Sequence, residues 1–299
     1  MPDDRPMMAD FVGIAGSFPP VTRRIFMTAS AAAAAGYTLA AGPVRAAAIT
    51  TDTNGLTAGM VKVKVKDGEM PAYRAKPANA KNPPVIIVAM EIFGLHEYIK
   101  DVCRRWAKLG ALAVAPDYYY RMGDLTQVTD MQQLFPKVNS KKDSELYSDL
   151  DSTVAWAKAD GGDTNRLGIM GFCRGGRTTW MYAAHQPKLK AAVAFYGPPE
   201  NPIGDALTSQ PLNEVKNVKC PVLGLYGDKD TGIPVASVTK IEQAMDAAKK
   251  TSEFRVYPGA PHGFHADYRP SYNQAAADDA WKLATAWFKK YHVLPGSMA

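Results

Sequence analysis

The chain has 299 residues, of which 46% are hydrophobic, 10% aromatic and 21% charged. These fractions lie in the normal range for a globular protein and exclude a disordered chain, a collagen and a coiled coil. The net charge of +6 arises from 35 basic and 29 acidic residues that are interleaved along the chain, so nucleic acid is not an expected partner, whereas a preference for small anionic ligands stays open.

Residues 1–48 are predicted to be an export signal. The pair Arg23-Arg24 precedes a weakly hydrophobic, alanine-rich run over 29–41, and both Val44-Arg45-Ala46 and Ala46-Ala47-Ala48 fit the small-x-small rule for signal-peptide cleavage. The segment resembles a twin-arginine (Tat) signal, which implies the Tat export machinery as a partner and a periplasmic or secreted location. An amphipathic helix or an unstructured tail is the alternative. A stable membrane anchor is not expected, because alanine, with threonine, dominates a stretch that also contains Gly36, Gly42 and Pro43.

Cleavage after Ala48 would leave residues 49–299, a good size for a single α/β domain. This domain is predicted to open with an antiparallel hairpin. Apolar and polar residues alternate from Val61 to Val65, Asp67-Gly68 supplies a turn, and Met70 to Lys76 can return as the partner strand.

Short, continuous apolar runs follow the hairpin and are typical of buried parallel strands. They cover residues 85–90, 112–115, 167–170, 191–195, 222–226 and 254–257. Segments with helical spacing of apolar residues lie between them or follow them, at 102–109, 146–157, 175–184, 235–248 and 275–291. Strand and helix therefore alternate, which predicts a mostly parallel sheet with helices on both faces.

Four unusual segments directly follow predicted strands. They are Glu-Ile-Phe-Gly at 91–94, Gly-Phe-Cys-Arg-Gly-Gly at 171–176, Gly-Asp-Lys-Asp at 227–230 and Gly-Ala-Pro-His-Gly at 259–263. Ligands of such sheets bind beyond the carboxyl ends of the strands. We therefore expect all four segments to meet at one edge and to form the functional site.

The second of these segments contains a candidate nucleophile. In Gly171-x-Cys173-x-Gly175, a cysteine stands between a strand and a helix with small neighbours, as in the nucleophile elbow of α/β-hydrolases. The helix N-terminus would favour both a thiolate and an oxyanion. The alternative is a buried structural cysteine, which is what we expect for Cys103 and Cys220. The three cysteines suit neither a disulfide framework nor a metal site.

Chain order supplies the partners, because an α/β-hydrolase places its acid and then its histidine after the nucleophile. His262, between Pro261 and Gly263, is the predicted base, and His265 competes with it. Asp228 and Asp230 are both candidates for the acid that fixes the histidine tautomer.

The chain resembles the dienelactone hydrolase family in four segments. They are Glu-Ile-Phe-Gly at 91–94, Pro-Asp-Tyr-Tyr-Tyr-Arg at 116–121, Gly-Phe-Cys-Arg-Gly-Gly at 171–176 and Pro-His-Gly-Phe at 261–264. The resemblance spans about Val61 to Tyr291 and implies an α/β-hydrolase with a Cys-His-Asp triad. It implies no cofactor and no metal. The acid of the family stands four residues before a proline, as Asp230 stands before Pro234, and the resemblance therefore favours Asp230.

The same resemblance implies roles for further residues. Glu91 would pair with the resting thiol, and the backbone N–H groups of Ile92 and Arg174 would form the oxyanion hole. Arg121 matches an arginine that binds the substrate carboxylate in the family. The second family arginine is replaced by Ala266, and the candidates to take its place are Arg269 and Arg174.

The sequence thus predicts a cysteine hydrolase of ester or lactone bonds, similar to carboxymethylenebutenolidase, which converts dienelactone to maleylacetate. Its substrate would be a small ester or lactone, with an anionic one left open, and its intermediate would be a thioester on Cys173. An acyl transferase with the same intermediate is an alternative, as is a non-hydrolytic binding or redox-sensing protein on this fold. The intact set of Cys173, Asp230 and His262 argues against a pure binding protein.

Overall fold

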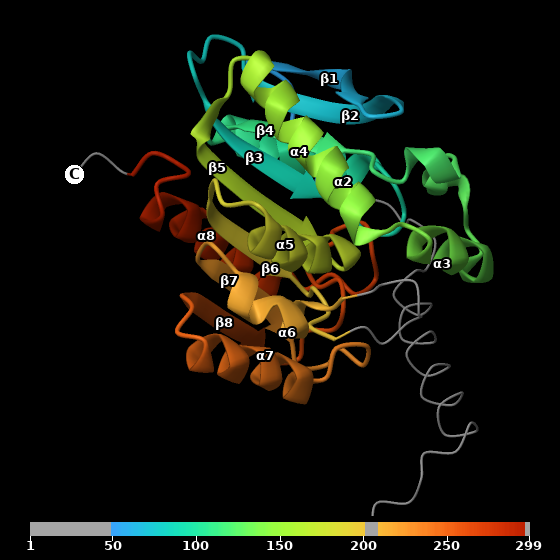
Figure 1. Ribbon diagram of the computed structural model, residues 1–299, viewed down its shortest axis with the longest axis vertical. Helices are drawn as coiled ribbons and strands as arrows, with labels where there is room; N and C mark the ends of the chain where they lie inside the picture. The colour runs from blue at the N-terminus through green and yellow to red at the C-terminus, as the bar shows by residue number, and fades with distance from the viewer. Residues whose placement is uncertain (1–48, 201–208, 297–299) are drawn as a thin grey trace, which may run out of the picture.

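The computed structural model describes residues 49–200 and 209–296, so the predicted export signal at 1–48 lies outside the described residues. Eight strands form one sheet in the order β1-β2-β4-β3-β5-β6-β7-β8 (Figure 1). In chain order they are β1 (Leu56–Val65), β2 (Gly68–Pro77), β3 (Pro84–Ala89), β4 (Leu112–Pro116), β5 (Asp163–Phe172), β6 (Leu189–Phe195), β7 (Val222–Gly227) and β8 (Ser252–Tyr257).

The pairing of the strands confirms the predicted sheet. β1 and β2 form an antiparallel hairpin, and β2 also runs antiparallel to β4. Every other pair, from β3 with β4 to β7 with β8, is parallel. β3, β4 and β7 are buried along their whole length, which explains why their sequences are continuous apolar runs rather than alternating ones.

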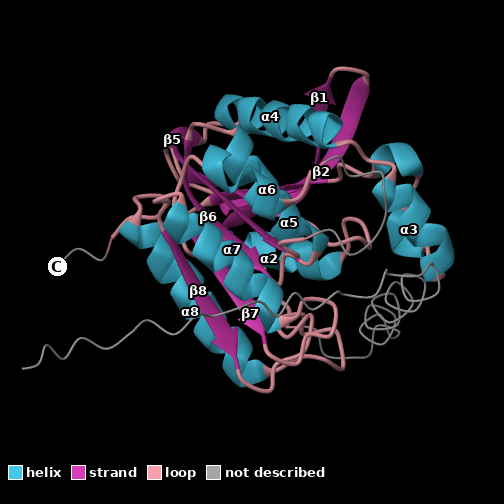
Figure 2. Ribbon diagram, turned by 60° about the horizontal axis from the view of Figure 1, so that its bottom comes forward, coloured by secondary structure: helices cyan, strands magenta, loops and turns pink. Residues whose placement is uncertain are grey.

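Helices lie on both sides of the sheet (Figures 1 and 2). They are α2 (Glu97–Lys108), α3 (Met131–Asn139), α4 (Asp143–Ala159), α5 (Arg174–His185), α6 (Pro211–Glu214), α7 (Val235–Ala247) and α8 (Gln274–Lys290). α2 and α8 meet through Trp106 and Trp281, whose ring centroids are 4.3 Å apart. α4 and α5 lie side by side over the sheet on the viewer's side of Figure 1. Among the described residues, every helix falls short of the length and apolar character needed to cross a bilayer.

Several elements differ from the sequence prediction, among them α6, which was not expected, and β1, which begins at Leu56 rather than at Val61. α3 was not expected, because only Leu134 and Val138 of this short helix are buried and Pro136 interrupts its pattern. β5 begins at Asp163 rather than at Leu167, since its first four residues are polar and are either partly buried or, at Asn165, exposed. Apolar periodicity marks an element only where that element faces the core.

The carboxyl ends of the parallel strands lie at one edge of the sheet. Ala89 at the end of β3 pairs with Gly171 near the end of β5, and Gly227 at the end of β7 pairs with Tyr257 at the end of β8. The four segments that follow these strands therefore start from the same edge, as the parallel order requires. This edge carries the candidate active site.

Candidate active site

Cys173 lies on a sharp turn between β5 and α5. Its φ of 56° and ψ of −120° are strained for a residue with a side chain, and such strain is typical of functional turns. The turn requires its glycines, because a Cβ on Gly171 would lie 2.2 Å from the carbonyl oxygen of Gly175. A Cβ on Gly175 would lie 2.1 Å from the carbonyl oxygen of Ala89. The elbow geometry that the sequence pattern predicted is present at this position.

The backbone around Cys173 offers amide donors at the start of α5. Cys173 is the N-cap of this helix, and its own N–H donates to the carbonyl of Phe195 over 3.0 Å. The N–H of Arg174 belongs to the first helical turn, where no intrahelical acceptor is available. The close approach of Gly175 to Ala89 and Met90 brings the loop with Ile92 against the elbow. The two amides predicted for the oxyanion hole thus come from adjoining segments.

His262 and Asp230 form a buried pair. Nδ1 of His262 lies 2.6 Å from Oδ2 of Asp230, and the other carboxylate oxygen accepts the backbone N–H groups of Gly232 and Ile233 at 2.9 and 3.0 Å. Burial lowers the pKa of His262, but the charge of Asp230, the proximity of Cys173 and hydrogen bonds with both outweigh it and raise the pKa to about 10. The structure therefore places His262 so that it interacts with both Asp230 and Cys173.

The competing candidates have other roles. Asp228 holds the turn after β8, because its Oδ1 accepts the backbone N–H of Gly259 at 2.6 Å. His265 is a core residue that is only 2% exposed, and its Nδ1 lies 2.6 Å from the Tyr98 hydroxyl oxygen. Burial and the charge of Arg105 lower the pKa of His265 to about 3, so this ring stays neutral.

Glu91 is buried and ionised, but its partners differ from the predicted thiol. Its Oε2 accepts the Tyr268 hydroxyl at 2.6 Å and lies 3.3 Å from Nε2 of His96, while its Oε1 accepts from Arg269 over 3.5 Å. Burial raises the pKa of Glu91, yet the Arg269 charge and the contacts of His96 and Tyr268 lower it to about 2. The predicted pairing with Cys173 is therefore not the arrangement in this structure, because stronger donors hold the carboxylate.

Arg269 lies at the centre of the site, as the sequence left open. Its guanidinium is 4.6 Å from the Phe93 ring centroid and its Nε donates to the Tyr268 hydroxyl oxygen at 2.8 Å. Cys173 is among the groups whose charge acts on Arg269. The side chain of Arg174, the other candidate, contacts Oδ1 of Asn139 in α3 at 3.4 Å. Of the two, Arg269 is the cation next to the thiol and Glu91.

Arg121 is already neutralised by the protein. Its Nε and Nη2 donate to Asp67 in the β1–β2 turn at 2.7 and 2.5 Å, and its Nη1 donates to Asp149 in α4 at 2.8 Å. The prediction that it binds a substrate carboxylate required a free positive charge. The structure instead shows Arg121 joining the hairpin to α4, with Lys141 as a second partner of Asp149 at 2.6 Å.

We expect Arg121→Ala to act through stability rather than substrate choice. Loss of the two ion pairs should lower the melting temperature by roughly 2–4 °C. The ratio of kcat/KM for a carboxylated ester to that for its neutral analogue should stay within twofold of wild type. Thermal unfolding and parallel assays of the two esters measure both effects. A selective loss of the carboxylated substrate would restore Arg121 to the binding site.

Three aromatic or histidine side chains of the site were missed by sequence reasoning. Tyr268 and His96 hold Glu91, and Tyr196 directly follows β6. The ring of Tyr196 contacts that of His262 at a centroid distance of 5.0 Å, its φ is 37°, and its buried hydroxyl has no hydrogen-bond partner among the described residues. Its position at the carboxyl end of a buried strand was the available signal.

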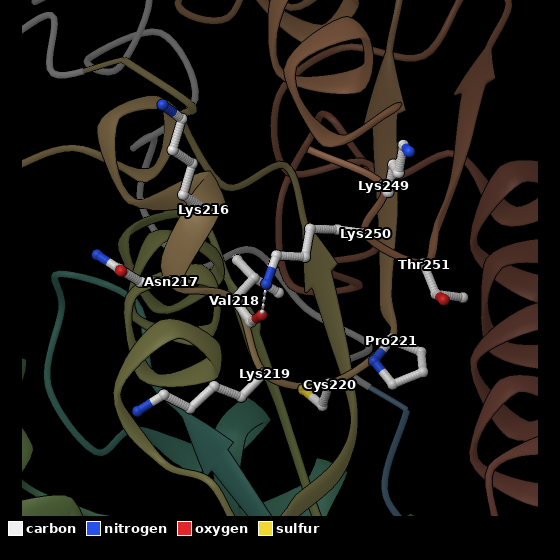
Figure 3. Close-up of a pocket in the computed structure, with 9 residues that line it drawn as sticks. All are labelled: Lys216, Asn217, Val218, Lys219, Cys220, Pro221, Lys249, Lys250 and Thr251. Atoms are coloured by element: carbon white, nitrogen blue, oxygen red, sulfur yellow. Dashed lines mark hydrogen bonds between the residues drawn. The ribbon is translucent and has the colours of Figure 1, made fainter. Parts of the chain in front are cut away.

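A lysine-rich cavity of about 580 Å³ lies elsewhere in the molecule (Figure 3). Its lining, Lys216 to Pro221 with Lys249 to Thr251, precedes β7 and β8 and therefore lies at the amino ends of these strands. Lys250 donates to the carbonyl of Val218 at 2.8 Å, whereas the ammonium groups of the other lysines point in different directions. This cavity is at the edge of the sheet opposite Cys173 and takes no part in the site.

Comparisons with known proteins agree with the geometry. Residues 70–292 match the model of the dienelactone hydrolase family. A protein of Methylorubrum extorquens described as "Putative carboxymethylenebutenolidase" is 53% identical over 266 residues, covering 87% of this chain and 90% of its own. One of Escherichia coli K12 with the same description is 45% identical, covering 86% and 95%. The crystal structure of a "Putative Dienelactone Hydrolase" from Klebsiella pneumoniae has a TM-score of 0.77 at 46% identity and covers 79% of this chain and 99% of its own.

Proposed function

The chain belongs to the dienelactone hydrolase family and is an α/β-hydrolase of that type, and from this premise we propose that its nucleophile is the thiol of Cys173. The observation that carries the proposal is the juxtaposition of three groups at one sheet edge. Cys173 occupies the strained elbow, and the buried His262–Asp230 pair, with 2.6 Å between Nδ1 and Oδ2, interacts with it. This order of base and acid around a nucleophile is the arrangement that acyl transfer requires.

The first half of the reaction forms a thioester. His262 takes the thiol proton, and the sulfur of Cys173 attacks the carbonyl carbon of the ester or lactone. The negative charge that develops on the carbonyl oxygen would be held by the N–H groups of Ile92 and Arg174. When the tetrahedral intermediate collapses, the C–O bond breaks and His262 gives its proton to the leaving oxygen. In a lactone that oxygen stays attached to the acyl group.

The second half releases the acid. His262 removes a proton from water, the resulting hydroxide attacks the thioester carbon, and the sulfur of Cys173 leaves and recovers its proton. Asp230 keeps the imidazole in one orientation through both halves and stabilises its protonated form, in keeping with the raised pKa of His262. No cofactor takes part in this sequence of steps.

We propose Arg269 as the residue that attracts an anionic substrate. It lies beside the thiol, and its side chain is buried against Glu91, so a substrate carboxylate would compete with Glu91 for the same cation. The contact that would be replaced is long, at 3.5 Å, and is thus open to competition. The buried hydroxyl of Tyr196 is a further donor at this point. A small ester or lactone that carries a carboxylate fits this set of groups.

Trapping the intermediate tests the proposed reaction. Wild-type enzyme is quenched during turnover of p-nitrophenyl acetate, of simple lactones and of dienelactones, and its peptides are weighed by mass spectrometry. We expect an acyl adduct on the peptide that contains Cys173, and an acid as the released product. An adduct on any other residue would contradict the mechanism. If added alcohols or amines collect the acyl group in preference to water, the protein is an acyl transferase instead.

We further propose that residues 1–48 direct export. The Arg23-Arg24 pair, the alanine-rich run and the Ala46-Ala47-Ala48 motif support delivery by the Tat machinery to the periplasm or the medium. Because the Tat machinery exports folded proteins, the three cysteine thiols would already be buried when the domain reaches an oxidising compartment.

A further inference from the structure

We propose that cleavage of the leader after Ala48 creates an α-ammonium group on Ile49 that pairs with the buried carboxylate of Asp267 and fastens the active-site loop 262–269. The inference rests on the proposed export and adds a structural role for the processed end. It concerns residues that take no direct part in the chemistry, and it is argued from the contacts of Ile49, Asp267 and α2.

Asp267 has one carboxylate oxygen satisfied and one that is not. Its side chain is 2% exposed, and its Oδ2 accepts from Nη2 of Arg105 at 2.5 Å. Its Oδ1 is buried and lacks a hydrogen bond of ordinary geometry within the described part of the chain. A buried carboxylate oxygen without a donor is costly, and such an atom usually marks a missing partner.

The backbone nitrogen of Ile49 is the nearest candidate for that partner. Burial raises the pKa of Asp267, while the guanidinium of Arg105 and, more weakly, the N–H of Ile49 act in the opposite direction. Ile49 also lines a cavity of about 340 Å³ together with Arg105, His265 and Trp281. The first described residue of the chain therefore lies beside the unsatisfied carboxylate.

The residues that follow Ile49 are held against α2 by hydrogen bonds. The N–H of Thr51 donates to Oδ1 of Asp101 at 2.5 Å. Lys108 donates to the Asp52 carboxylate and to the carbonyl of Asn54 at 2.7 and 2.8 Å. These contacts hold residues 51–54 against the helix, beginning two residues after Ile49.

The charges around this point favour an added cation. On α2, Arg104 and Arg105 face the three carboxylates of Glu97, Asp101 and Asp267 through contacts of 2.5–3.1 Å. Glu97 is 64% exposed, whereas the buried carboxylates of Asp101 and Asp267 share the single guanidinium of Arg105. On the opposite side of the cavity, α8 contributes one negative and one positive side chain, Asp278 and Lys282. His265 and Tyr272 are also part of the lining. An ammonium group supplies three donors and one positive charge where a peptide bond supplies a single neutral donor.

Asp267 connects this point to the active site through the chain itself. Its neighbours Tyr268 and Arg269 are the donors that hold Glu91, and His265 on the other side lies 2.6 Å from the Tyr98 hydroxyl. Fixing both oxygens of Asp267 would therefore restrict the segment that carries these donors. The exported enzyme would differ from its precursor by a more firmly held loop.

Two matched forms of the domain test the pair. One begins at Ile49 and the other at Ala48, so that the amine of the second is displaced by one residue, about 3.8 Å of chain. Both contain every described element from β1 to α8. At pH 7 we expect the Ile49 form to melt roughly 3–10 °C higher. In an Asp267→Asn background the two forms should melt at the same temperature.

The pH dependence gives an independent readout. An ammonium group that gains a carboxylate partner has its pKa raised above the unfolded value of about 7.7–8.0. The advantage of the Ile49 form should be complete below that value and should disappear as the pH rises through the higher folded pKa. Amide exchange of residues 265–269 should be slower in the Ile49 form at pH 7. Equal melting temperatures and equal exchange in the two forms would overturn the proposal.

Mass spectrometry of the chain recovered from the periplasm or medium of expressing cells completes the test. We expect its first residue to be Ile49. A different first residue, or a retained leader, would overturn the proposal for the natural protein. Hydrolysis of p-nitrophenyl acetate by both matched forms is measured separately, because failure of that activity would contradict the proposed function without affecting the comparison of melting temperatures.

Discussion

Replacing Cys173 with alanine is expected to lower kcat/KM for ester and lactone hydrolysis by about 10⁴-fold or more, because the variant has no atom that can form the thioester. The steady-state rate with p-nitrophenyl acetate measures the loss. The melting temperature should change little, since the side chain is small and the glycines that shape the elbow stay in place.

Cys220→Ala and Cys103→Ala are the matched controls. Both thiols are buried away from His262, and burial holds the pKa of Cys220 at about 12 and that of Cys103 higher still, so neither is a reactive thiolate. We expect these variants to retain activity. Full activity in Cys173→Ala would show that the nucleophile is another residue, and loss in a control alone would point to that cysteine.

Asp230→Asn should lower kcat by roughly 10³–10⁴-fold, as expected when the acceptor of the histidine Nδ1 proton is lost. The asparagine oxygen could still accept the N–H groups of Gly232 and Ile233, so the loop should keep its shape. His262 would then face an amide in place of a charge, and its pKa should fall toward the usual range because the charge of Asp230 raises it in the wild type.

Asp228→Asn provides the control two residues away. Its amide oxygen can continue to accept the N–H of Gly259, so the turn after β8 should persist and the rate should stay close to wild type. Stopped-flow measurement of the acylation step for both variants separates the two aspartates. If Asp228→Asn is the damaging change and Asp230→Asn is silent, the assignment of the acid is reversed.

The fold was predictable from the sequence because its signals are local. Continuous apolar runs mark β3, β4 and β7, which are buried on both faces, and alternation marks the hairpin of β1 and β2. The Gly-x-Cys-x-Gly pattern around Cys173 predicted the elbow because close backbone contacts exclude any larger residue at Gly171 and Gly175.

The contacts of the charged residues were not predictable in the same way. Arg121 finds Asp67 across 54 residues of sequence, and Glu91 finds Tyr268 across 177. Nothing local in the sequence distinguishes an arginine that binds a substrate from one that binds two carboxylates of its own chain. Side-chain partners at such separations depend on the packing of the finished fold.

The burial of all three cysteines bears on how long the enzyme lasts where oxidants are present. Cys173 is 2% exposed, and neither Cys103 nor Cys220 exceeds 6%. Peroxide is small enough to reach a thiol in a narrow site, whereas glutathione disulfide or a second protein chain is not, so mixed disulfides and crosslinked aggregates should form slowly. Damage would then proceed through sulfenic acid at Cys173, a step that only a thiol small enough to enter the site could reverse. The working life of the enzyme would be set by its rate of peroxide exposure.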